Sequence, residues 1–206
     1  MTRNLYATDR IKGFTDGVVA IVMTILVLEL VLPHQNTHHL SANDLKTFLW
    51  DQVDNFVAYL LSFWMVSKYW VSHFELFEKV TWVNSRIINL NLVFILSLTF
   101  IPFPTQIMSH YDNALSYILF NLSIGWPALM LAIMLKAVHS HEGVKEHLKS
   151  HFAIHQKDFT YLVLMVLLSM IIAIVSLWTQ WSMLLWLLTR FFEKIEPYCQ
   201  QWLPRL

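Results

Sequence analysis

Asp16 is the residue whose position most needs a chemical explanation, since its carboxylate stands at the start of a long apolar run. An unpaired anion in surroundings without water is unfavourable, roughly by several kcal/mol. Arg10 lies six residues earlier in the sequence. That spacing puts it about 120° around a helix, so the two side chains do not face each other. We therefore expect Asp16 to bond to a side chain from another segment.

Further polar residues stand at the ends of two other apolar runs, where they could meet Asp16. Polar groups inside a membrane are costly and each needs a partner. Arg10, Arg86 and His73 are the candidate partners of the carboxylate. We predict a hydrogen-bonded plate that ties the first three apolar segments together; the alternative is a set of unrelated interfacial residues. The plate would contain Arg10, Phe14, Thr15, Asp16, Trp70, His73, Arg86, Asn89 and Asn91.

A second pattern follows one face of the first apolar segment. Gly17, Ile21, Thr24 and Leu28 fall within about 60° of arc on a helix. From the residues alone, such a stripe is more often a packing surface than the lining of a pore. A threonine there can also satisfy its hydroxyl by bonding to the carbonyl one turn back. Both readings stay open at this point.

The remaining reactive side chains form no pattern typical of an enzyme or a metal centre. Cys199 is the single cysteine, which excludes an internal disulfide and a multi-cysteine metal cluster. His147, His151 and His155 are spaced to share one helix face, but no carboxylate completes a strong metal-binding motif. No nucleophile stands in evident register with a base. We predict a protein that is not an enzyme and has no resident metal or cofactor.

The composition predicts what kind of scaffold holds these residues. Of 206 residues, 56% are hydrophobic and 14% are charged, whereas ordinary soluble domains have about 25% charged residues. The formal net charge is zero, so nothing indicates a nucleic-acid partner. Four glycines are too few for a phosphate-binding loop, and the sequence has no Gly-Tyr-Gly stretch for a filter lined by backbone carbonyls. The fold class expected is an all-α polytopic membrane protein in a lipid bilayer.

Six apolar runs are candidates for membrane-spanning helices, which need about 20 residues each. They form one domain, 1–206, with no soluble part. Pro33 ends the first run, Pro102 and Pro104 interrupt the third, and Pro127 predicts a kink in the fourth. The runs are Phe14–Leu32, Phe48–Ser72, Ile87–Ile101 with an extension to Met108, Ala114–Val138, Phe159–Trp178 and Trp181–Phe192.

The placement of lysine and arginine predicts the orientation. With the N-terminus inside, the inner segments hold 12 of the 14 lysines and arginines. Lys46 is the one such residue in an outer segment, and Lys68 lies low in the second run. Since basic residues collect on the cytoplasmic side, both termini are predicted to be cytoplasmic in a multi-pass protein of the plasma membrane.

The start of the first run carries a short motif. The stretch from Arg10 to Asp16, RIKGFTD, resembles the R-x-x-x-F-[S/T]-D signature of the transmembrane protein 175 family of potassium channels. The resemblance continues through Gly17 to Glu29, and it includes Trp70 to His73. Asn89, Asn91 and the Ile101–Thr105 sequence IPFPT extend it over the first half of the chain. Thr15 stands where serine is usual and keeps the hydroxyl.

The resemblance implies a specific assembly and activity. Members of this length resemble single six-helix repeats that assemble as homotetramers, with the first helices around a central pore. The resemblance assigns the pore-lining positions to Ile21, Thr24 and Leu28. Potassium would be the permeant ion, with modest selectivity over sodium, because a ring of Ile21 would form an apolar constriction that expels water. The plate would then hold the helices in register without touching the ion.

Two other classes of function remain in view. A proton- or cation-coupled secondary transporter could use Asp16, Glu29 and His73 as a relay. Discontinuous helices and inverted repeats would support that class, and Pro102-Phe-Pro104 is the one candidate break. A membrane-embedded enzyme or structural protein is the other class. Ion flux that saturates and needs a counter-ion would favour the transporter.

Overall fold

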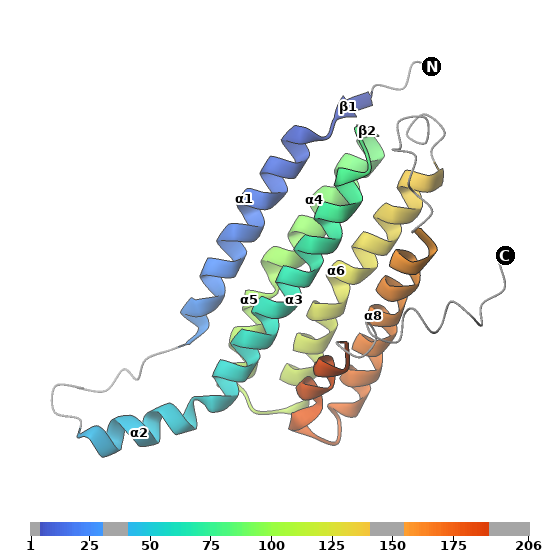
Figure 1. The fold of residues 1–206 in the computed structure, drawn as a ribbon. Coiled ribbons are helices and arrows are strands. Elements are labelled where there is room, and N and C mark those ends of the chain that lie inside the picture. The colour runs from blue at the N-terminus through green and yellow to red at the C-terminus, as the bar shows by residue number, and fades with distance from the viewer. Residues whose placement is uncertain (1–4, 31–40, 141–154, 190–206) are drawn as a thin grey trace.

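The computed structural model describes residues 5–30, 41–140 and 155–189, and these form an elongated bundle of helices (Figure 1). α6 lies in the middle of the bundle and packs against α3, α4, α5 and α8, while α1 lies at one edge against α3 and α4. The long helices are α1 (Asp9–Ile25), α3 (Val53–Glu78), α4 (Ser85–Phe100), α6 (Ala114–Ser140) and α8 (His155–Val175). The shorter elements are β1 (Leu5–Ala7), η1 (Leu26–Glu29), α2 (Ala42–Asp51), β2 (Trp82–Asn84), α5 (Pro102–His110) and η4 (Gln180–Leu188).

Three segments are long and apolar enough to cross a membrane by length and composition: Asp9–Leu28, Ser85–His110 and Ala114–Ser140. The chain is thus a mostly helical protein with several membrane-capable segments. α3 and α8 have 26 and 21 residues, which also exceeds the length that a span needs. The count of six spans stays a prediction.

The first and second predicted spans differ from the observed helices at their ends. α1 begins at Asp9, five residues before the predicted start at Phe14, and its last turn tightens into η1. The second predicted span is divided at Gln52, where the backbone (φ −91°, ψ 0°) leaves the helical region. Phe48 therefore belongs to the separate helix α2, and α3 continues past Ser72 to Glu78.

The prolines act in the third and fourth segments as their chemistry requires. α4 ends at Phe100 and α5 begins with Pro102 in its first turn, because a proline has no N–H to continue the ladder. Ile101 between them is fully buried, so the break lies inside protein. Pro127 is accommodated within α6, which runs unbroken for 27 residues.

The sixth predicted span differs over its described part. From Gln180 to Leu188 the chain forms a 3-10 helix of nine residues, about 18 Å long and too short to cross a bilayer. It packs against α6 and α8. Two buried bonds hold it there: Trp186 Nε1 donates to Asn121 Oδ1 at 2.8 Å, and the hydroxyls of Ser176 and Ser182 are 2.7 Å apart. Residues beyond 189 lie outside the described part.

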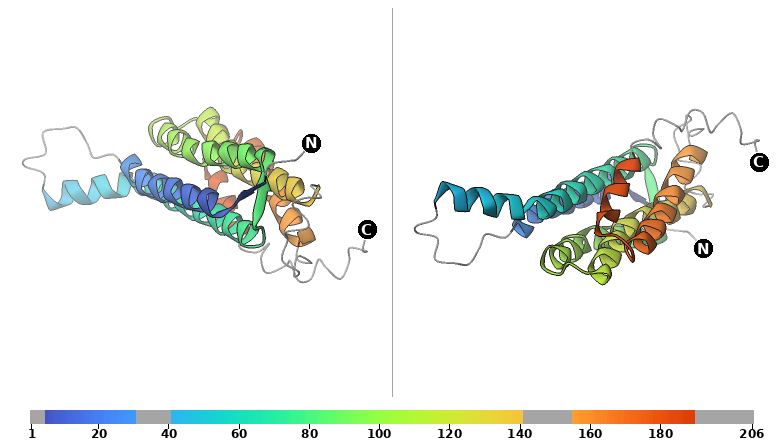
Figure 2. Two further views of the ribbon diagram at one scale, coloured as in Figure 1. Left: turned by 90° about the horizontal axis from the view of Figure 1, so that it is seen from above. Right: turned by 90° about the horizontal axis from the view of Figure 1, so that it is seen from below.

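A small sheet is the exception to the all-α expectation. β1 and β2 pair antiparallel, with Tyr6 opposite Val83 and Ala7 opposite Trp82. Aromatic and β-branched residues favour this extended pairing. The strands lie at the end of the bundle where α3 returns into α4 (Figure 1 and Figure 2). The sheet therefore joins the start of α1 to the connection between α3 and α4.

Candidate functional site

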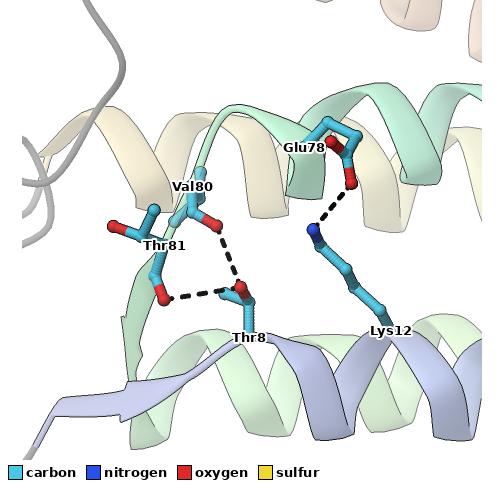
Figure 3. Close-up of polar contacts among 5 residues, drawn as sticks. All are labelled: Thr8, Lys12, Glu78, Val80 and Thr81. Atoms are coloured by element: carbon cyan, nitrogen blue, oxygen red, sulfur yellow. Dashed lines mark hydrogen bonds and ion pairs between the residues drawn. The ribbon is translucent and has the colours of Figure 1, made fainter.

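α1 is the element on which the predicted site residues converge, and its first turn is anchored to the α3–α4 connection (Figure 3). Thr8, at the N-cap position, is buried and makes no side-chain cap. Its Oγ1 instead donates to the carbonyl of Val80 at 3.0 Å, and its backbone N–H donates to Thr81 O at 3.3 Å. Lys12 Nζ lies 2.8 Å from Glu78 Oε1 one turn further on. These contacts fix the position of the helix end.

The partner of Asp16 is Trp70, and not one of the three basic side chains that the sequence suggested. Trp70 Nε1 donates to Asp16 Oδ1 at 2.8 Å, which joins α3 to α1. The indole N–H is a donor only, so this bond has a fixed direction. A neutral donor satisfies the carboxylate while leaving its negative charge in place.

A buried chain of hydrogen bonds lies beside this pair and joins three helices. The hydroxyl of Thr15 donates to Ile11 O at 2.9 Å, so its oxygen accepts from Asn91 Nδ2 at 3.0 Å. The amide oxygen of Asn91 then lies 2.7 Å from Nε2 of His73. Because that oxygen can only accept, Nε2 must carry the proton. All three side chains are almost fully buried.

The imidazole of His73 stacks on two phenyl rings. Its ring stacks on Phe77 at 4.4 Å between centroids and on Phe94 at 5.2 Å, nearly parallel to the second. One ring comes from its own helix and the other from α4. The orientation of the histidine is therefore fixed by stacking as well as by Asn91.

The other predicted members of the plate lie on the surface of this chain. Arg10, Phe14, Arg86 and Asn89 are all exposed. Asn91, named with Asn89 in the sequence reading, is the asparagine that joins the helices. The signal that separates them is periodicity: Asn91 continues the buried series Ile87, Phe94 and Leu98 on α4, whereas Asn89 lies off it.

The face of α1 that carries Gly17, Ile21, Thr24 and Leu28 points away from the chain. Ile21 is 57% exposed and Leu28 is 71% exposed. The opposite face packs inward, since the buried residues are Thr15, Val19, Val22 and Leu26, about 180° around the helix. A smaller share of residues is buried in the Asp9–Leu28 segment than in α6. The predicted stripe therefore has no partner within the described chain.

The hydroxyl of Thr24 is the polar group on this face of α1. Thr24 Oγ1 donates to the carbonyl of Ile21 at 2.7 Å. This bond uses the hydroxyl hydrogen, so the oxygen of this exposed residue is left as an acceptor for a hydrogen bond or a ligand for a cation.

The described residues do not contain the cluster of ligands that a metal site would need. No group of three or more His, Cys, Asp or Glu side chains among them could hold a metal ion. His147, His151 and Cys199 lie outside the described part, and nothing is described of the side chains of Glu29 and His155.

The chain resembles known channels in sequence. A family model described as "Endosomal/lysosomal potassium channel TMEM175" matches residues 10–102. Potassium channel HX13_20290 of a Chryseobacterium species is 35% identical over 74% of this chain and 75% of its own length. Potassium channel Cha6605_3372 of Chamaesiphon minutus is 33% identical over 50% of each chain. The match thus spans about half the length of the Chamaesiphon relative and three quarters of the Chryseobacterium one.

The fold is similar to that of a solved structure over almost its whole length. The crystal structure of a lysosomal potassium-selective channel TMEM175 homologue from Chamaesiphon minutus superposes with a TM-score of 0.75. It covers 92% of this chain and 97% of that one at 22% identity, so the likeness concerns the fold. Together with the sequence matches, this shows that the chain belongs to the TMEM175 family of ion channels.

Proposed function

We propose that this chain is a subunit of a homotetrameric potassium channel whose central pore is lined by α1. The observation that carries the proposal is the exposed face of α1, which lies opposite the buried ridge that packs on α3 and α4. This helix has one face packed and the opposite face apolar and unpartnered. Copies of such a helix from several subunits can be arranged around a central axis. The family membership and the names of its bacterial relatives support potassium as the permeant ion.

Rings of Ile21, Thr24 and Leu28 would set the chemistry of conduction. Narrow apolar rings expel water, so an ion meets a desolvation barrier at Ile21 and again at Leu28. Potassium holds its hydration shell less tightly than sodium, and such a barrier therefore favours potassium modestly. The Thr24 oxygens would offer ligands between the two rings, since the hydroxyl hydrogens are bound to Ile21 carbonyls. No filter of backbone carbonyls is required.

The polar side chains at the N-terminal half of α1 would position the pore helix and not touch the ion. Asp16 with Trp70, and Thr15 with Asn91 and His73, fix α1 against α3 and α4. The proposed plate also includes four residues that are exposed in the single chain: Arg10, Phe14, Arg86 and Asn89. The proposal includes a plasma-membrane location with both termini in the cytoplasm, as the distribution of basic residues suggests.

Ion flux from purified protein in liposomes tests the proposal, with Ile21→Asn compared with Ile171→Asn. Ile171 is a matched control, since it lies on α8 and is 56% exposed against 57% for Ile21. We expect the wild type to pass potassium faster than sodium. Ile21→Asn should raise sodium flux, because an amide ring holds water that an isoleucine ring excludes, and Ile171→Asn should leave the ratio unchanged.

Two results would overturn it. An equal effect of both substitutions would mean that Ile21 faces lipid and lines no pore. Flux that saturates and depends on a counter-ion would support the coupled transporter instead, with Asp16 and His73 as the described members of its relay.

A further inference from the structure

Among the described helices, α2 packs little against the rest of the chain. None of its ten residues is buried, and Figure 1 shows it pointing away from the bundle. Its main contact among the described elements is with α3. The helix is nonetheless strongly amphipathic. At 100° per residue, an apolar arc of about 120° contains Ala42, Leu45, Phe48 and Leu49, and the opposite arc contains Asn43, Asp44, Thr47 and Asp51.

Such a short helix needs support from outside its own backbone, because isolated helices below about 12 residues are marginal in water. A capping box supplies part of it: Ser41 Oγ accepts from Asp44 N at 3.3 Å, while Ser41 N donates to Asp44 Oδ2 at 2.9 Å. The Ser41 hydroxyl also donates to Asp44 Oδ2 at 2.7 Å, and this bond, together with that from Ser41 N, lowers the pKa of the Asp44 carboxyl. The cap satisfies the helix end but does nothing for the apolar arc, which still requires a partner.

The position of α2 along the chain indicates what that partner is. A single residue, Gln52, separates it from α3, and Asn55 Nδ2 braces the junction by donating to Gln52 Oε1 at 2.6 Å. η1, the last turn of the membrane-capable segment Asp9–Leu28, packs on α3 and α5. α2 therefore lies beyond the C-terminal end of that segment, at the end of the bundle remote from β1 and β2 (Figure 1).

Exposed aromatic side chains gather at the same end. Trp50 on α2 is 78% exposed, and Trp178, just after α8, is 77% exposed. Tyr111 between α5 and α6 and Trp181 on η4 are exposed as well. Tryptophan and tyrosine collect at the level of lipid headgroups, since their rings are apolar and their N–H or O–H groups are polar. Four such residues from separate elements indicate the depth of a membrane surface.

From these observations we propose that α2 is an interfacial helix that inserts its apolar arc, Leu45, Phe48 and Leu49, among the headgroups and upper acyl chains of the bilayer. Lys46 lies about 40° beyond the Ala42 edge of the arc, and Trp50 about 80° beyond it, next to the polar arc. From the arc's edge, the long cationic chain of Lys46 can reach the headgroups. The polar arc carries two carboxylates, which would repel anionic headgroups. The proposed binding therefore depends on the apolar arc and not on anionic lipid. The exposed series Leu49, Val53, Phe56 and Leu60 continues the apolar surface from α2 onto α3.

This proposal goes beyond ion conduction and does not depend on it. The rival occupant is a second copy of the chain, which would cover the same arc with protein. The two can be distinguished because lipid admits dissolved oxygen freely, whereas a protein interface excludes both oxygen and water-soluble probes.

Spin labels on the full chain in phosphatidylcholine vesicles provide the test. In a Cys199→Ser background, labels are placed at Leu45→Cys and Leu49→Cys on the apolar arc and at Asn43→Cys and Thr47→Cys on the polar arc. Collision rates with oxygen and with a water-soluble nickel chelate are then compared. We expect oxygen to dominate at Leu45 and Leu49 and the nickel chelate to dominate at Asn43 and Thr47. All four positions are exposed, so the substitutions disturb no packing.

Two outcomes would overturn the proposal. Labels at Leu45 and Leu49 that collide with neither probe would identify a protein interface with a second copy. If labels at Leu45 and Leu49 collide with the nickel chelate as strongly as labels at Asn43 and Thr47 do, the apolar arc of α2 faces water.

Discussion

The indole nitrogen of Trp70 lies 2.8 Å from a carboxylate oxygen of Asp16, and this bond links α3 to the helix that we propose as the pore lining. The two residues are 54 positions apart in the chain. The buried chain from Thr15 through Asn91 to His73 links the same part of α1 to α4 and α3. α1 is therefore held at its N-terminal half by side-chain hydrogen bonds, while its exposed stripe extends toward the other end.

Trp70→Phe removes the indole donor and keeps most of the aromatic surface. We expect a loss of stability of about 1–2 kcal/mol, because a charged acceptor loses its partner. The midpoint of thermal unfolding in detergent would measure it. Trp178→Phe is the matched control, since Trp178 is exposed and its substitution should have no effect. Equal midpoints for the two variants would show that the bond contributes nothing to the fold.

Asn91→Leu should be far more damaging than Asn89→Leu, although the two residues are two positions apart on α4. The first change leaves His73 Nε2 and Thr15 Oγ1 buried without this partner, at a cost of about 1–3 kcal/mol. The second replaces an exposed amide and should stay within about 0.5 kcal/mol. The midpoints of thermal unfolding of both variants test this prediction. Similar losses of stability in the two variants would contradict the hydrogen-bond chain.

The sequence was sufficient to predict a helical membrane protein and the segments that would meet around Asp16. It was insufficient for the pairing itself, because Coulomb attraction favoured Arg10 or Arg86, whereas the fold brings the neutral Trp70 within reach. The choice between Asn89 and Asn91 could have been made from periodicity, since Asn91 shares a face with Ile87 and Phe94.

Other features depend on contacts that no local pattern reveals. The pairing of Leu5–Ala7 with Trp82–Asn84 joins strands far apart in the chain, and three residues are too short for a period to be seen. The apolar run after Trp181 has the composition of a span. Over its described part it forms a short 3-10 helix, in which Trp186 bonds to Asn121 and Ser182 meets Ser176.

The anchor at Thr8 allows a comparison between a buried and an exposed contact. Thr8→Val removes the hydroxyl that donates to Val80 O in a buried place and should cost about 1 kcal/mol. Lys12→Met removes the ion pair with Glu78, which is partly exposed and screened, and should cost less than about 1 kcal/mol. Chemical denaturation at low and high salt separates them, since only the effect of Lys12→Met should shrink as salt rises. A salt-dependent loss in Thr8→Val would argue against this assignment.

At Gly125, α6 packs closely against α8, and this contact supports a prediction with an internal control. A Cβ at this position would overlap Oγ and Cβ of Ser169, whose hydroxyl donates to Asn121 O at 2.8 Å. Gly125→Ala must push the two helices apart or displace Ser169, and overpacking of this kind costs about 1–3 kcal/mol. Gly17→Ala, where nothing lies within 4 Å of the new Cβ, should leave thermal unfolding unchanged or slightly improved. Combining Gly125→Ala with Ser169→Gly should recover part of the loss, because the space left by the serine accepts the new methyl group. A Gly125→Ala variant as stable as the wild type would show that α6 and α8 do not pack this closely.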